Sequence, residues 1–183
     1  GLGRIDLEFI LISIGPKRHR EGSNRRATGH VALEQWDEGE RIVHLQNVME
    51  ARGQHVRPGD IALLWTDWPR RQSWGALAFW TEAPWTGLSA CRWLVARGVK
   101  AVGYDYPPDQ PVRDLVTGRR RTIAPEEWAT HHTFFPAGIG VIEYLVNLDR
   151  LGREGVRFAA LPLRLEGGGG APPRATAARS GSG

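Results

Sequence analysis

The sequence predicts a single α/β domain, on three observations. The chain has 183 residues, 41% of them apolar, and eight tryptophans, which is enough to bury one substantial core. A continuous apolar run from Ile61 to Thr66 is typical of a strand that is buried on both faces. The helix expected from Leu88 to Arg97, ended by Gly98, leads into a second strand from Val99 to Tyr104. This strand, helix, strand order predicts a right-handed parallel crossover.

The N-terminal part of the chain gives weaker signals. Ile5 to Ile14 is apolar enough for a strand, and a basic polar stretch follows from Gly15 to Arg26. We therefore expect residues 1–27 to form a basic N-terminal segment outside the domain, which would occupy residues 28–178. A short helix is expected from Gln46 to Arg52.

The segment from Trp68 to Thr86 lies between the strand that ends at Thr66 and the helix that begins at Leu88. It is expected to be a long loop rich in tryptophan. Exposed indoles at this density favour association, so we expect the loop to cover a pocket or to contact a second subunit.

The C-terminal part is expected to contain a short helix and two strands. Pro125, followed by Glu126 and Glu127, is typical of a first helical turn. Gly138 is expected to open the next strand, and the last strand is expected from Arg157 to Leu165. From Gly167 onward the chain is rich in glycine, alanine and serine, and residues 179–183 are expected to be a disordered tail.

His131 and Glu143, twelve positions apart, are the candidate site residues. His131 ends the polar turn of the helix that starts at Pro125, and Glu143 stands in an apolar strand beside Val141, Ile142 and Leu145. A carboxylate in such a strand is costly to bury unless a metal, a proton or a cation compensates its charge. Imidazole and carboxylate together suit zinc or manganese. Each residue alone also fits a plain structural position, with Glu143 facing solvent on an edge strand and His131 on the surface.

Composition excludes several classes of protein and site. The single cysteine, Cys91, rules out an internal disulfide framework and a cysteine-rich zinc site, and its helical spacing with Leu88 and Leu94 indicates a buried apolar position. The longest apolar run, around Phe9 to Ile14, is too short to cross a bilayer. No stretch indicates an export signal, so we expect a cytoplasmic protein without a membrane partner.

The formal net charge of +4 raises the question of nucleic acid. Basic residues cluster from Lys17 to Arg20 and from Arg119 to Arg121, in glycine-rich or turn-like segments. A solvated basic face explains them better than a nucleic-acid surface does. The run from Arg119 to Arg121 precedes the helix of His131, where it could attract an anionic substrate.

Several segments together, over roughly residues 56 to 178, resemble the cyclase family of metal-dependent hydrolases, which includes bacterial kynurenine formamidases and isatin hydrolases. The resemblance rests on Pro58-Gly-Asp-Ile-Ala-Leu-Leu-Trp-Thr-Asp-Trp68, Gly87-Leu-Ser89, Trp93-Leu94, Gly98-Val-Lys-Ala-Val-Gly-Tyr-Asp105, Leu148-Asp149, Leu161-Pro-Leu-Arg-Leu165 and Ala171-Pro-Pro-Arg-Ala175. It implies a swivelling β/β/α fold, here expected as one domain with a mixed sheet. It also implies that His131 and Glu143 complete a metal site, with Phe134 and Phe135 in place of two family leucines.

The chain departs from the family in three places. It lacks the signature His-x-Gly-Thr-His-x-Asp-x-Pro that supplies the main metal ligands, and the nearest fragment, around His30, is expected to be a strand leading toward Trp36. The aspartate of the closing motif is replaced by Gly169. The family's Asp-x-x-Ser-x-Asp is reduced to Asp105-Tyr-Pro-Pro-Asp109, which we interpret as turn chemistry rather than a second carboxylate cluster.

The resemblance implies an enzyme that uses zinc or manganese to activate water for attack on an amide, formamide or cyclic amide carbonyl. Arylformamidase activity in tryptophan catabolism, on N-formylkynurenine, is the family's best-known example. His131 and Glu143 are the expected catalytic and metal-binding residues of a small-molecule hydrolase that forms a homodimer or homotetramer. The alternative is a non-catalytic or truncated relative that keeps the fold and its oligomer contacts. A nucleic-acid-binding module is a third, weaker alternative.

Overall fold

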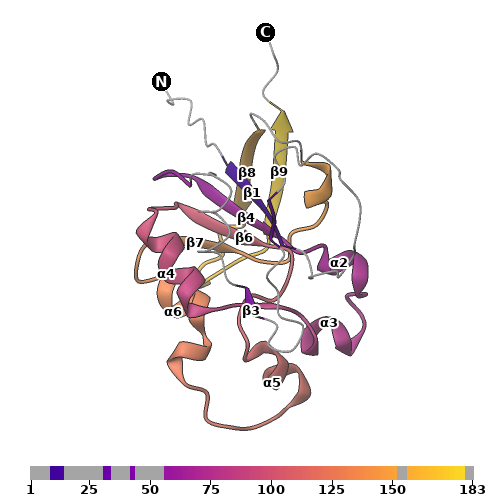
Figure 1. The fold of residues 1–183 in the computed structure, drawn as a ribbon. Coiled ribbons are helices and arrows are strands. Elements are labelled where there is room, and N and C mark those ends of the chain that lie inside the picture. Colours follow the sequence, from indigo (N-terminus) through magenta and orange to yellow (C-terminus); the bar gives the residue numbers. More distant parts are fainter. Residues whose placement is uncertain (1–8, 15–30, 34–41, 44–55, 152–155, 180–183) are drawn as a thin grey trace.

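A computed structural model of the protein describes residues 9–14, 31–33, 42–43, 56–151 and 156–179. Its centre is a five-stranded sheet in the order β2-β1-β4-β6-β7 (Figure 1). Every pairing in this sheet is parallel. The predicted α/β class is therefore confirmed, but the expected mixed sheet is parallel in all its described pairings. The strands are β1 (Phe9–Ile14), β2 (Val31–Leu33), β4 (Ile61–Trp65), β6 (Ala101–Tyr104) and β7 (Gly140–Ile142).

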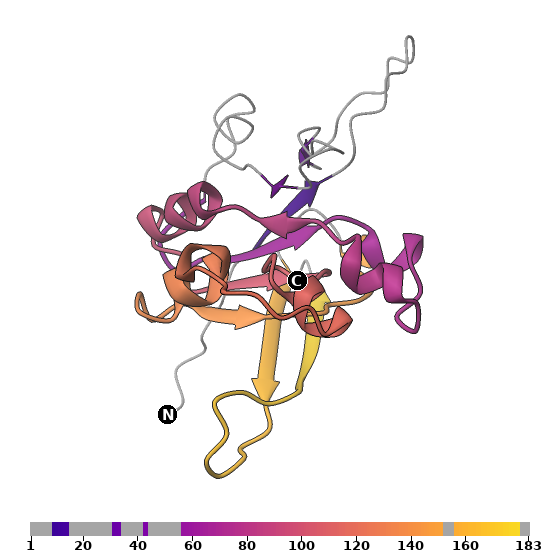
Figure 2. The same ribbon diagram turned by 90° about the horizontal axis from the view of Figure 1, so that it is seen from below.

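Two smaller pairs of strands accompany the sheet. β3 (Ile42–Val43) pairs in parallel with β5 (Trp85–Thr86). β8 (Val156–Pro162) and β9 (Pro173–Arg179) form an antiparallel hairpin, which projects away from the sheet (Figure 2). Antiparallel pairing among the described strands is confined to this hairpin.

Short helices connect the strands. They are α2 (Trp68–Arg71), α3 (Leu77–Thr81), α4 (Leu88–Ala96), α5 (Val112–Thr117) and α6 (Ala129–Phe134), with 3₁₀ turns η1 (Pro125–Glu127) and η2 (Leu148–Arg150). α4 ends as predicted, because Gly98 adopts a left-handed φ of 70° that other residues rarely reach. In the part of the chain that the structure describes, no helix could span a bilayer.

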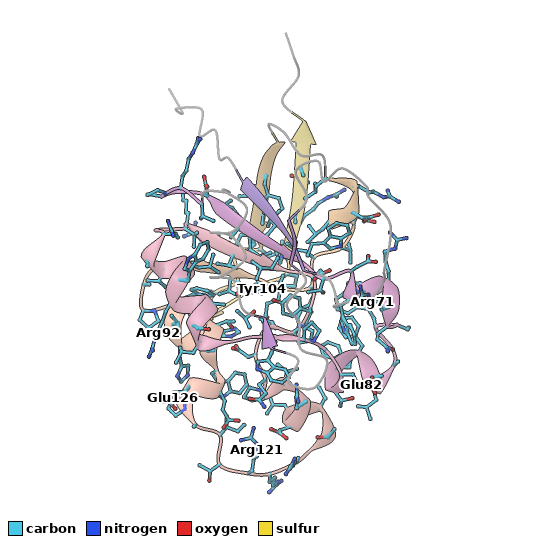
Figure 3. All side chains as sticks on the ribbon, in the orientation of Figure 1. Arg71, Glu82, Arg92, Tyr104, Arg121 and Glu126 are labelled. Atoms are coloured by element: carbon cyan, nitrogen blue, oxygen red, sulfur yellow. The ribbon has the colours of Figure 1, made fainter. Side chains whose placement is uncertain are left out.

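The core lies on both faces of the sheet, which explains the continuous apolar run of β4. Ala62 and Leu64 face the helices, whereas Ile61 and Leu63 face the side on which Phe158 of β8 is buried. Figure 1 shows this arrangement, with α4 and α6 on one side of the sheet and the hairpin on the other. Tyr104, labelled in Figure 3, is fully buried between sheet and helices.

Gly103 of β6 leaves room for two leucine side chains that any larger residue would have to displace. A Cβ atom there would lie 2.6 Å from Cδ2 of Leu63 and 2.7 Å from Cδ1 of Leu145, closer than non-bonded carbons approach. The missing side chain lets the turn after β7 pack directly on the centre of the sheet, and this turn carries Glu143.

The strand expected from Ile5 to Ile14 is observed as β1, and it pairs with β4 in the middle of the sheet although it lies in the segment expected outside the domain. No strand was expected after Gly167, and the disordered tail was expected to start at residue 179. Instead, Pro173–Arg179 forms β9, because the partner strand β8 supplies its hydrogen bonds. α5 was not expected either. The helix expected at Gln46 to Arg52 and residues 180–183 of the expected tail lie outside the described residues.

The segment from Trp68 to Thr86 was expected to be a long loop, but it contains secondary structure. It forms α2, α3 and β5, and Trp68 is buried, with its Nε1 donating to the Phe79 carbonyl at 2.9 Å. Trp74 stacks on Phe79 with ring centroids 4.3 Å apart. Aromatic packing rather than apolar periodicity therefore stabilises these short helices.

Candidate functional site

His131 is positioned by α6, whose opposite face is anchored in the core. Phe134 is fully buried in the cluster that joins α6 to α4, whereas Phe135 is exposed. The side chain of His131 is 31% exposed, and its ring meets that of Phe135 edge to face at 5.1 Å. His132 is exposed and has no part in these contacts, as expected for the next residue along a helix.

Glu143 follows the last residue of β7 instead of lying inside the strand as predicted. The chain turns sharply there, because Tyr144 adopts a left-handed φ of 61°. Such a conformation is unfavourable for a tyrosine unless its surroundings hold it. The Tyr144 ring packs edge-on against Trp74 and Trp80, at centroid distances of 5.5 and 5.6 Å, and the Leu145 N–H donates to the Tyr104 carbonyl at 2.7 Å. These contacts fix the direction of Glu143.

The structure brings the two predicted residues together. Nε2 of His131 lies 4.0 Å from Oε1 of Glu143, and both side chains are about two-thirds buried. This distance falls within the range of about 3 to 6 Å that a shared metal or water requires. Their catalytic and metal-binding roles stay predictions.

A third residue, Asp109, joins the pair. Nδ1 of His131 makes a short hydrogen bond to Oδ2 of Asp109. Asp109 is itself 2% exposed, and it accepts the Thr130 N–H at 2.8 Å and the Thr130 hydroxyl at 2.6 Å. Asp109, His131 and Glu143 thus form a carboxylate–imidazole–carboxylate row.

Sequence reasoning missed Asp109 because two aspartates around Pro-Pro also fit an ordinary turn. Its position was the usable signal: it follows β6, and the carboxyl ends of parallel strands are where sites gather. Asp105 is equally buried, and it accepts hydrogen bonds from Thr66 and Asp67 instead of entering the site. Burial raises the pKa of Asp105 to about 6. Neither aspartate belongs to a solvated turn.

The pKa values of the paired residues are shifted in ways that fit a site. The hydrogen bond to Asp109 raises the pKa of His131, against the opposing effect of burial. Burial raises the pKa of Glu143, and the nearby imidazole opposes this. Perturbed groups that face one another beside a cleft are typical of functional sites.

His131 and Glu143 open onto a cleft of about 960 Å³ at the β7 edge of the sheet. One wall is formed by Phe135, Val141 and Ile142. The other comes from Ala160 and Pro162 of β8 and from residues 169–173. Among the described residues that line the cleft there is no lysine or arginine, and most are apolar. A small molecule with an uncharged, apolar body fits such walls.

The described part of the chain contains no larger cluster of possible metal ligands. No group of three or more His, Cys, Asp or Glu side chains in residues 56–151 and 156–179 is arranged to hold an ion. His30 and His44, the remaining histidines considered as ligands, lie outside the described residues. Cys91 is buried, and burial raises the pKa of its thiol well above the ordinary value, in agreement with the predicted structural role.

Arg121, the last residue of the arginine run, is held in ion pairs. Arg121 binds Glu127 through both terminal nitrogens, at 2.8 and 2.5 Å, and its Nε donates to Asp114 at 2.7 Å. These bonds fasten the segment after α5 to η1, far from the sheet in Figure 3. The hydrogen bond from Arg121 lowers the pKa of Glu127 to about 2.

Comparison with known proteins finds one matching family model and several solved structures with a similar fold. The Cyclase family model, described as "Putative cyclase", matches residues 26–108. Isatin hydrolase A from Ralstonia solanacearum is 25% identical with a TM-score of 0.61, over 75% of this chain and 53% of that one. A structure described as a potential metal-dependent hydrolase with cyclase activity is 25% identical with a TM-score of 0.52, over 74% of this chain and 57% of that one.

An isatin hydrolase bound to the product analogue thioisatinate shares the fold, at 23% identity and a TM-score of 0.57, over 72% of this chain and 49% of that one. The chain therefore spans about half the length of the solved structures that it matches. No curated protein matches it significantly.

Proposed function

Because this chain resembles the cyclase family in both sequence and fold, we propose that it is a hydrolase of that family and depends on a divalent metal, zinc or manganese. The observation that carries the proposal is the meeting of His131 and Glu143 at the mouth of an apolar cleft. The alternative of nucleic-acid binding, which was suggested by the basic composition, has no comparable support. Arg121 of the basic run is engaged in ion pairs.

The donor set fits part of a metal site. An imidazole nitrogen and a carboxylate oxygen are the ligand types that zinc and manganese accept, and at 4.0 Å both atoms can reach one ion. They supply two ligands, whereas a catalytic zinc site normally has three protein ligands and a water. The remaining ligands would have to come from residues outside the described ones, His30 or His44 among them, or from the rest of a longer protein.

The chain's own residues have defined tasks in the proposed reaction. When bound, a divalent metal supplies carbonyl polarisation and a water of lowered pKa. Glu143 and His131 divide the roles of ligand and proton acceptor: one of them takes the proton that the attacking water loses and returns it to the leaving nitrogen. The apolar wall of Phe135, Val141 and Ile142 limits the access of further water.

The proposed substrates are amides, formamides or cyclic amides with an apolar body. The lack of cations in the described cleft lining disfavours a carboxylate-bearing group deep in the pocket. The direct test is hydrolysis of an aryl formamide and of isatin by the zinc- and manganese-loaded protein, followed by absorbance. Activity that survives replacement of both His131 and Glu143 would contradict this assignment of the site.

We expect the chain to bind zinc or manganese weakly, because two or three protein ligands are fewer than a tight catalytic site needs. The measurements are the metal content after dialysis and titration calorimetry. A tightly held ion at one per chain, retained in the His131→Ala variant, would place the metal elsewhere.

The competing proposal is a non-catalytic or truncated relative that keeps the fold. One observation favours it: among the described residues, no group of three or more His, Cys, Asp or Glu side chains is arranged to hold an ion. A protein that binds an aryl amide in the cleft with either metal present, but does not hydrolyse it, would support this alternative.

Self-association as a homodimer or homotetramer stays a proposal. The structure moves the expected contact surface from the tryptophan-rich segment to the hairpin of β8 and β9. Trp68 is buried and Trp74 is only 37% exposed, whereas Leu161 of the hairpin is 76% exposed and Leu163 is 63% exposed. We therefore expect association through the hairpin, to be measured by sedimentation velocity at micromolar concentration. Leu161→Lys should yield monomers, and Leu77→Lys, beside the tryptophans, should not. If Leu77→Lys yields monomers and Leu161→Lys does not, the tryptophan-rich surface forms the contact. If the unmodified protein is monomeric, neither surface mediates association.

A further inference from the structure

We propose that Asp109 is a positioning residue, which fixes the neutral ring of His131 in the form protonated on Nδ1 and thereby turns the Nε2 lone pair toward Glu143 and the cleft. The effect of Asp109 on metal binding rests on the proposed function. The position of the proton on the His131 ring follows from the hydrogen bonds alone and does not depend on a metal.

The hydrogen bonds around Asp109 determine which atoms can donate. A carboxylate only accepts, and Asp109 accepts from the Thr130 N–H through Oδ1 and from the Thr130 hydroxyl through Oδ2. Nδ1 of His131 also meets Oδ2, so the proton of a neutral ring resides on Nδ1. With its side chain fully buried, Asp109 has no water to compete for these bonds.

The opposite nitrogen then faces an acceptor. Nε2 of His131 without a proton lies 4.0 Å from the Glu143 carboxylate, and neither atom can donate to the other. The lone pair on Nε2 of His131 and those of the Glu143 carboxylate can together bind a positively charged group. That group can be a metal ion or a proton in transfer. A backing carboxylate of this kind orients a histidine ligand and increases its basicity.

Asparagine at position 109 reverses this arrangement without changing its shape. The Thr130 backbone N–H can only donate, so the amide oxygen must take the place of Oδ1. The amide nitrogen then occupies the place of Oδ2 and donates to Nδ1 of His131. The ring is forced to carry its proton on Nε2, where it blocks the lone pair that faces Glu143.

The test is ¹⁵N NMR of the imidazole in metal-free protein at alkaline pH, with His131 assigned by the loss of its signals in His131→Gln. The unmodified protein should show Nδ1–H, and Asp109→Asn should show Nε2–H. Asp114→Asn removes another buried carboxylate, one that pairs with Arg121, and should leave the His131 ring unchanged. An Nε2–H ring in the unmodified protein would overturn the proposal, whether or not the variant folds.

A second readout connects this role to the site. Zinc affinity should fall about 10- to 100-fold in Asp109→Asn, the usual effect of losing a partner that orients a ligand, and stay unchanged in Asp114→Asn. If the unmodified protein binds no zinc, the proposed function fails while the NMR result still decides the role of Asp109. If Asp109→Asn keeps the Nδ1–H ring, the positioning role fails and the proposed function is untouched.

Discussion

Replacing Glu143 by glutamine should weaken zinc or manganese binding by about 100-fold or more. The loss of a residue that only orients a metal ligand costs at most about 100-fold, and Glu143 is proposed to be a ligand itself. Glutamine keeps the size of the side chain but removes its negative charge, and its amide is a poor ligand for either ion. Among the described residues at the cleft, Glu143 and His131 are the two proposed metal ligands, and no third ligand completes a cluster there that could compensate for the loss of Glu143. Titration calorimetry measures the loss.

The matched control is Glu126→Gln. Glu126 is exposed on η1, at the surface of the molecule in Figure 3, and the same change of charge there should leave metal affinity within about twofold, since exposed charges at a distance are screened by salt. Equal losses in both variants would show that overall charge governs binding. Unchanged affinity in Glu143→Gln would remove this residue from the proposed site.

Replacing Phe134 by alanine should lower the free energy of unfolding by about 3–5 kcal/mol, the range for emptying a buried aromatic position. Phe134 is completely buried between α6 and α4, and a domain of this size is stable by only about 5–15 kcal/mol. Because α6 carries His131, the same change should also disorder the site. Urea unfolding followed by tryptophan fluorescence measures the stability.

The neighbouring residue provides the control. Phe135 is 56% exposed on the wall of the cleft, so Phe135→Ala should change stability by less than about 1 kcal/mol while altering contacts to a bound ligand. Equal destabilisation by the two variants would mean that α6 is held by its exposed face.

The elements that the sequence predicted well are those whose own residues determine them. Strand Ile61–Trp65 is apolar throughout because both of its faces are buried, and α4 ends at a glycine that the backbone requires. The proximity of His131 and Glu143 was expected from the family resemblance rather than from the local pattern, since Glu143 follows β7 instead of lying inside the strand.

The elements that the sequence did not predict depend on distant partners. Pro173–Arg179 has little apolar pattern and becomes a strand through pairing with β8. α2 and α3 are too short for a periodic signal and are held by contacts such as that of Trp68 with Phe79. Asp109 is distinguished from a turn residue only by its burial against Thr130 and His131, which no local pattern records.

The two walls of the cleft belong to parts of the chain that are synthesised at different times. The wall with His131 and Glu143 precedes β8, which supplies the opposite wall together with residues 169–173. The sheet behind the first wall pairs strands across long separations, as where Phe9 lies opposite Ile61, whereas β8 and β9 form a nearby hairpin. Local hairpin pairing forms faster than non-local parallel pairing, so the wall that β8 and β9 supply does not depend on the slow assembly of the sheet. Ligand binding that needs both walls therefore requires both the sheet and the hairpin to have formed.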